Sequence, residues 1–205
     1  MRTIRQGGSK QTSILIDGAN LHATCAALGF NVDYKKLVES FDGSIWKNYY
    51  FTAIPPNEEY SSIRPMIDYL QFNGFTVIMK PTKELTSVTK FTCQSCNIEN
   101  SISQTRTKGN MDVEIAVIAK EIAPYVDHVV LFTGDGDFCF LIEALQRTYG
   151  TYVTVVSTVK GRHKLCSDDL RRQADDFVDL ADIRQHVERT EDQRSTARRN
   201  FLNGS

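Results

Sequence analysis

The chain has 205 residues, a length that suits one domain with tails or an insertion. Hydrophobic residues make up 41% and charged residues 24%, which indicates a globular protein that can bury a substantial core. With 24 Lys and Arg against 25 Asp and Glu, the net charge is -1. This balance excludes a strongly basic nucleic-acid coat protein and a highly acidic solvating protein, but it does not exclude a local patch of either sign.

The sequence has no apolar run of about 18 residues, so no membrane span is predicted. Residues 1–12 are polar, lack the apolar core of a signal peptide and are predicted to form a flexible arm. Residues 183–205 are polar and charged and are predicted to form a C-terminal helix or tail. Five cysteines at irregular spacing do not suggest a disulfide framework, so we expect a cytoplasmic protein with reduced thiols.

Short apolar runs alternate with helical patterns along the rest of the chain. This alternation predicts an α/β fold in which a mainly parallel sheet of about five strands is covered by helices on both faces, a three-layer α/β/α sandwich. The expected strands are 13–17, 45–54, 75–79, 128–132 and 152–157, with a short apolar segment at 177–180. The expected helices are 33–41, 58–72, 112–122, 138–149 and 165–174.

The segment 85–107 is polar and rich in Ser and Thr, and it is predicted to be an inserted hairpin or loop. Cys93 and Cys96 at its centre form half of a zinc-ribbon ligand set. The sequence has no second CxxC pair, and nothing in it brings His163 and Cys166 close to the first. Two free or redox-active thiols are therefore favoured over a Zn2+ site or a metal shared between subunits.

Polar residues gather at two of the predicted strand ends, where open α/β sheets form their binding sites. Carboxylates a few ångströms apart repel one another, and a hard divalent cation such as Mg2+ or Mn2+ removes that conflict. Such an ion can activate water and stabilise charge on a phosphoryl group. The residues that follow these strand ends are Asp17, Asn20, Thr133, Asp135 and Asp137, and Asp112 is expected on the same rim at the N-terminus of the helix that leads into the strand 128–132.

Each of these residues also has a simpler structural explanation. Asp17 or Asn20 would suit the cap of a turn or helix, and Asp112 is favourable at a helix N-terminus. Asp135 and Asp137 fit an ordinary turn between strand and helix. It is their expected convergence on one rim of the sheet that favours a metal-binding site.

These same segments resemble the NYN domain family of PIN-like nucleases, and in particular its LabA-like bacterial branch. The resemblance covers about residues 13–182. One departure is the Gly-Asn-Met-Asp sequence that ends at Asp112, which has one residue more than the glycine-valine-aspartate of the family. The segments that carry the resemblance are SILIDGAN (13–20), KGNMDVEIAVIAK (108–120), VVLFTGDGDFCFLIEAL (129–145) and LRRQADDFVDL (170–180).

The resemblance implies a PIN-like, Rossmann-like sandwich and metal-dependent endonucleolytic cleavage of single-stranded or structured RNA. Asn20 would assist the acidic pocket, and Thr133 would orient a carboxylate or a substrate phosphate. Mg2+ or Mn2+ is the expected cofactor. The residues that would bind metal and catalyse the reaction are Asp17, Asp112, Asp135 and Asp137.

Basic residues in the loops near this rim suit a polyanion held at its edges and cut at the centre. Phe91 and Tyr60 offer base-stacking faces, although packing roles are more common for such residues. Two alternatives stay open: a catalytically silent regulator that binds RNA or protein, and a DNA nuclease with the same pocket. A homodimer also stays open, and no membrane partner is expected. The expected phosphate-binding residues are Lys80, Lys108, Lys160, Arg162 and Lys164, and Lys83, Lys90 and Arg106 lie in the same basic segments.

Overall fold

The computed structural model describes residues 11–41, 44–54, 60–92, 98–161 and 164–190. None of the helices within these ranges combines the length and the apolar character needed to cross a membrane.

The central sheet has six strands, all parallel, in the order β3-β2-β1-β6-β7-β8. Strand order reverses beside β1, because β2 follows on one side and β6 lies on the other. This arrangement confirms the predicted mainly parallel sheet, with one strand more than expected. The strands are β1 (Gln11–Asp17), β2 (Ser44–Ile54), β3 (Phe75–Pro81), β6 (His128–Phe132), β7 (Tyr152–Ser157) and β8 (Asp176–Asp179).

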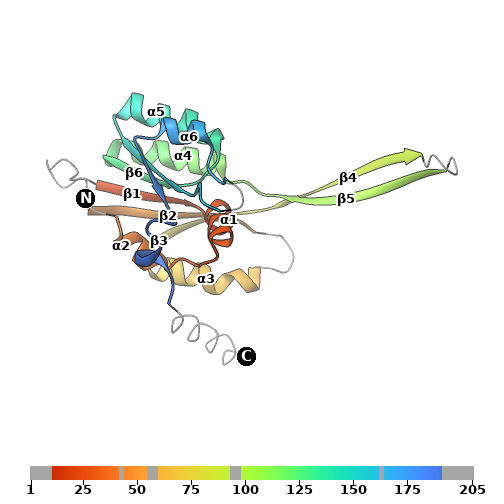
Figure 1. Cartoon of the computed structure of the whole chain (residues 1–205), viewed down its shortest axis with the longest axis horizontal. Helices are drawn as coiled ribbons and strands as arrows, with labels where there is room; N and C mark the ends of the chain where they lie inside the picture. The colour runs from red at the N-terminus through yellow and green to blue at the C-terminus, as the bar shows by residue number, and fades with distance from the viewer. Residues whose placement is uncertain (1–10, 42–43, 55–59, 93–97, 162–163, 191–205) are drawn as a thin grey trace.

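Helices cover both faces of the sheet (Figure 1). One layer holds α4 (Asp112–Ile122), α5 (Cys139–Tyr149) and α6 (Asp168–Gln173), and the opposite layer holds the others. The three-layer α/β/α sandwich is thereby confirmed. The helices of the opposite layer are α1 (Gly18–Leu28), α2 (Tyr34–Glu39), α3 (Tyr60–Phe72) and α7 (Arg184–Val187).

Strand β1 shows why the apolar runs fold as the middle layer. Leu15 is fully buried against the α4–α6 layer, whereas Ile14 and Ile16 are fully buried against the α1–α3 layer. Side chains alternate between the two faces of a strand, so a strand covered on both sides needs a continuous apolar run.

Element boundaries differ from the predictions at several ends. Strand β1 begins at Gln11, inside the expected N-terminal arm, and the apolar segment near 177–180 is the sixth strand, β8. The helix expected from residue 138 begins with a 3-10 turn, η2 (Gly136–Phe138). A second short 3-10 turn, η1 (Ala123–Tyr125), follows α4.

The predicted insertion is a hairpin of β4 (Lys83–Thr92) and β5 (Glu99–Lys108), which form a separate antiparallel sheet of two strands. It projects well beyond the sandwich (Figure 1). Cys93 and Cys96 lie outside the described residues, so their thiol or zinc chemistry stays a prediction.

Candidate functional site

A small pocket lies at the carboxyl ends of the central strands, where the strand order reverses. It encloses about 170 Å³ between the ends of β1 and β2, the start of α1, residues 109–112 and the loop after β6. All four predicted metal-binding aspartates contribute to its lining. Parallel topology explains this meeting, because strands that point the same way end at the same edge of the sheet.

Three of the four carboxylates form a tight group. One oxygen each from Asp112, Asp135 and Asp137 lies within 4.8 Å of the other two. Burial, followed by the negative charges of Asp135, Asp17 and Asp137, raises the pKa of Asp112, and nearby Lys80 partly opposes this rise. Oxygen ligands with uncompensated negative charge are what a hard divalent cation prefers, so the donor set fits Mg2+ or Mn2+.

Asp17 lines the same pocket but is held differently. Its side chain is buried, and Oδ1 accepts hydrogen bonds from the backbone N–H groups of Ala19, at 3.1 Å, and Asn20, at 3.2 Å. Its second oxygen, Oδ2, accepts from Asn20 Nδ2 at 2.6 Å. Asp17 thus caps α1 and lies outside the group of three, although its charge acts on Asp112.

Asn20 ties two strand ends together. Its Nδ2 donates to Asp17, at the end of β1, and its Oδ1 accepts from the backbone N–H of Gly134, just after β6, at 3.3 Å. The N-cap role considered for Asn20 is wrong, because Asp17 is the cap and Asn20 is the third residue of α1. Its side chain instead fixes the spacing between the two strands that carry the pocket.

The loop after β6 is shaped by its own side chains. The Oγ1 of buried Thr133 accepts from the backbone N–H of Asp135 at 3.2 Å, and Asp135 Oδ1 accepts from that of Asp137 at 3.0 Å. Gly134 lies so close to the neighbouring loop that an added Cβ would be 1.7 Å from the carbonyl oxygen of Leu165. Glycine therefore lets this loop bring both acids to the pocket.

Asn110 is a pocket residue that the sequence reasoning missed. Its Nδ2 donates to Asp112 Oδ2 at 2.6 Å, so it orients one carboxylate of the group. The preceding Gly109 also lines the pocket. The unusual Gly-Asn-Met-Asp spacing was the available signal, because the additional residue lies within this stretch.

The basic residues are only partly arranged as expected. Lys80 is near Asp112 but bonds Glu114 at 2.7 Å, which lowers the pKa of Glu114. Lys108 ends β5 and directly precedes a pocket residue. Lys164 pairs with Asp168. Arg162 lies outside the described residues, so its expected phosphate-binding role stays a prediction.

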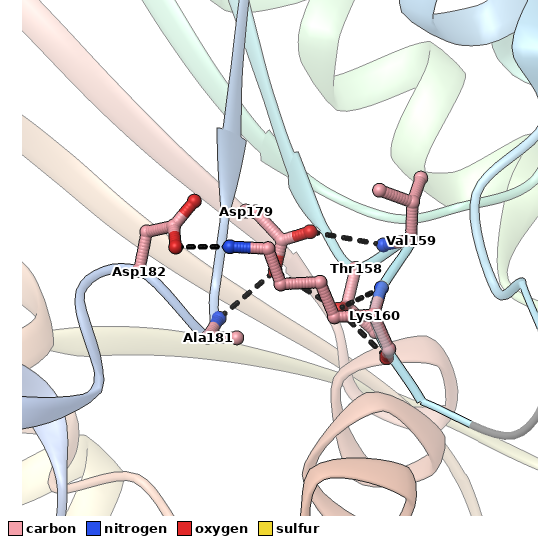
Figure 2. Close-up of polar contacts among 6 residues, drawn as sticks. All are labelled: Thr158, Val159, Lys160, Asp179, Ala181 and Asp182. Atoms are coloured by element: carbon pink, nitrogen blue, oxygen red, sulfur yellow. Dashed lines mark hydrogen bonds and ion pairs between the residues drawn. The ribbon is translucent and has the colours of Figure 1, made fainter.

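Lys160 belongs to a network at the ends of β7 and β8 (Figure 2). Its ammonium group bonds Asp182, and this contact raises the pKa of Lys160. Beside it, buried Asp179 accepts from Thr158 Oγ1 at 2.9 Å and from the backbone N–H of Val159 at 3.0 Å. These contacts join the two strand ends, and they give Lys160 a structural partner within the chain.

Comparison with known proteins identifies the family. The NYN domain matches residues 11–181. The chain belongs to the NYN domain family. The Low amplitude and bright protein LabA of Synechococcus elongatus is 30% identical over 183 residues, which cover 87% of this chain and 88% of LabA. This relative supports a place in the LabA-like part of the NYN family.

A solved structure matches this chain as well. VPA0982, a protein of unknown function from Vibrio parahaemolyticus RIMD 2210633, has a crystal structure similar to this chain, with a TM-score of 0.63 and 29% identity. The match covers 86% of this chain and 96% of that chain. The resemblance to NYN proteins drawn from the sequence is thereby confirmed, together with the PIN-like nuclease fold that this family implies.

Proposed function

We propose that this NYN domain is a divalent-metal-dependent ribonuclease that cuts RNA endonucleolytically in the cytoplasm. The observation that carries the proposal is the group of three carboxylates, whose oxygens lie within 4.8 Å in a pocket of about 170 Å³. Within the described ranges, the thiols of Cys25, Cys139 and Cys166 are free, which agrees with a reducing compartment.

The proposed division of roles follows the contacts. Asp112, Asp135 and Asp137 hold Mg2+ or Mn2+, and Asp17 adds negative charge to the same pocket. A divalent cation there supplies charge stabilisation at the scissile phosphate and activation of the attacking water. Asn110 orients Asp112 through its 2.6 Å hydrogen bond.

Asn20 and Thr133 act as positioning residues in this proposal. Asn20 holds Asp17 and the backbone of Gly134, and Thr133 holds the backbone of Asp135. Lys80 lies close enough to act on the pKa of Asp112, although it pairs with Glu114, and Lys108 directly precedes the pocket residue Gly109. Lys160 and Lys164 would have to leave Asp182 and Asp168 to contact RNA.

A cleavage assay with the purified full chain tests the proposal and its alternatives. End-labelled single-stranded RNA and DNA of the same sequence are incubated with Mg2+, with Mn2+ or with EDTA. We expect internal cuts in RNA with either metal and none with EDTA. Preferential cutting of DNA would favour a DNA nuclease, and RNA binding without cleavage in any metal would favour the silent regulator.

A further inference from the structure

The β4–β5 hairpin is an arm that the sandwich does not explain. Its ladder of ten residue pairs runs from Lys83–Lys108 at the base to Thr92–Glu99 toward the tip, about 30 Å at the usual rise of a strand. Figure 1 shows it reaching far from the body, and in the described ranges its strands pair only with each other. A two-stranded ribbon alone is marginally stable in water. Packing in the core of the sandwich therefore does not account for an arm of this length.

Both roots of the arm join the rim of the acidic pocket. The backbone N–H of Thr82, before β4, donates to the carbonyl oxygen of Ile54 at 2.8 Å. Gly109, after β5, lines the pocket, and an added Cβ on it would lie 2.6 Å from Ala53 Cβ and from Thr82 Cγ2. A polymer bound at the carboxylates would therefore lie beside the base of the arm.

The register of the ladder separates its residues into two unlike faces. Directly opposed residues share a face, and every second residue along a strand returns to it. One face, here the basic face, has Lys83, Arg106 and Lys108 among its ten positions and no acidic residue. The other face combines Lys90 with Glu84 and Glu99.

The base of the arm concentrates basic residues. Lys83 and Lys108 are direct partners in the register of the ladder, so two basic residues share one position next to the pocket rim. Farther along the same face, Phe91 is 45% exposed and Ile102 is 51% exposed, so they leave apolar surface open to a ligand.

We propose that the basic face holds single-stranded RNA that leads into the carboxylate pocket, an inference that rests on the proposed ribonuclease function. Lys83, Arg106 and Lys108 follow the phosphate backbone near the cut, and Phe91 stacks on a base farther out. Charge favours RNA over a protein partner, because this face is basic and otherwise mostly polar. A protein interface would be expected to offer a larger continuous apolar core.

Binding of a fluorescent 15-nucleotide single-stranded RNA in EDTA tests the arm separately from catalysis. For the double variant with Lys83→Gln and Arg106→Gln, we expect RNA binding about tenfold weaker than wild type. The slope of log affinity against log salt concentration should also become shallower by about 1.4, because each lost charge contributes about 0.7 to that slope. Phe91→Ala should weaken binding about fivefold or more without changing the salt dependence. The matched control is Lys90→Gln, which removes one charge from the other face and should stay within twofold of wild type.

Several results would overturn the proposal. One such result is wild-type protein that does not bind RNA in EDTA. Another is a double variant or Phe91→Ala variant that binds like wild type, and a third is a loss of affinity for Lys90→Gln as large as that of the double variant. A change of oligomeric state in sedimentation, with unchanged RNA affinity, would make the arm a contact between copies instead. Face-dependent RNA binding with no cleavage in Mg2+ or Mn2+ would support the arm while contradicting the ribonuclease proposal.

Discussion

Replacing Asp112 or Asp135 with Asn should lower the rate of RNA cleavage in Mg2+ or Mn2+ about 100-fold or more. This loss corresponds to ~3 kcal/mol of transition-state stabilisation. Each substitution keeps the size of the side chain but removes a charge from the group whose oxygens lie within 4.8 Å. The neutral amide is a weaker ligand for a hard cation. The measurement is the initial cleavage rate of labelled RNA at saturating metal.

The control for this loss is Asp68→Asn. Asp68 lies on α3, is about half exposed, and pairs with Arg64 at 3.8 Å, away from the pocket lining. The Asp68→Asn variant loses the same charge as the pocket variants, but it should cleave RNA at the wild-type rate. If Asp112→Asn and Asp135→Asn cleave as fast as Asp68→Asn while all three remain folded, the carboxylate group is not the catalytic centre.

Asn20→Asp should destabilise the protein by about 2–4 kcal/mol at pH 7.5 and also reduce cleavage. A carboxylate cannot donate to Asp17 Oδ2, which now lies 2.6 Å from Asn20 Nδ2, and two negative charges would meet in a partly buried site. Repulsion should raise the pKa of the carboxyl group introduced at position 20, so its protonation at lower pH should recover part of the lost stability. Urea unfolding at both pH values measures this change.

Asn31→Asp is the matched control, because it makes the same chemical change at an exposed position away from the pocket. It should change the free energy of unfolding by less than about 0.5 kcal/mol. Equal stability of Asn20→Asp and wild type would contradict the role of Asn20 as the tie between β1 and β6.

The convergence of the acids was predictable because topology alone decides it. Asp17 ends one parallel strand, Asp135 and Asp137 follow another, and those two strands are direct neighbours in the sheet. Asp112 joins them as the first residue of α4. Residue type and strand direction were sufficient, and no side-chain detail was required.

Side-chain partners distant in sequence were not predictable in the same way. Asn20 reaches Gly134, 114 positions away, and only the folded chain shows this contact. Lys160 was expected on phosphate, but it pairs with Asp182 because β7 and β8 end side by side. Spacing along the chain carries no information about such cross-strand partners.

The hairpin shows the same limit at the level of a whole element. Its polar, Ser- and Thr-rich composition predicted an insertion between sheet units. The two unlike faces depend on which residues oppose each other, and Lys83 opposite Lys108 follows only from the observed register. A shift of one residue would exchange the faces along one strand.

The most direct test of the metal-bound carboxylate group is the melting temperature of wild type and Asp112→Asn between pH 4 and 8, with and without Mn2+. The folded pKa of Asp112 is raised, so without metal the wild type loses stability as pH rises from the unfolded toward the folded pKa. The Asp112→Asn variant lacks this loss and should therefore melt at a higher temperature than wild type at pH 7.5 without metal. Mn2+ should raise the wild-type melting temperature, increasingly so at higher pH, and leave the variant nearly unchanged. Equal Mn2+ shifts in both proteins, or none in either, would contradict the account.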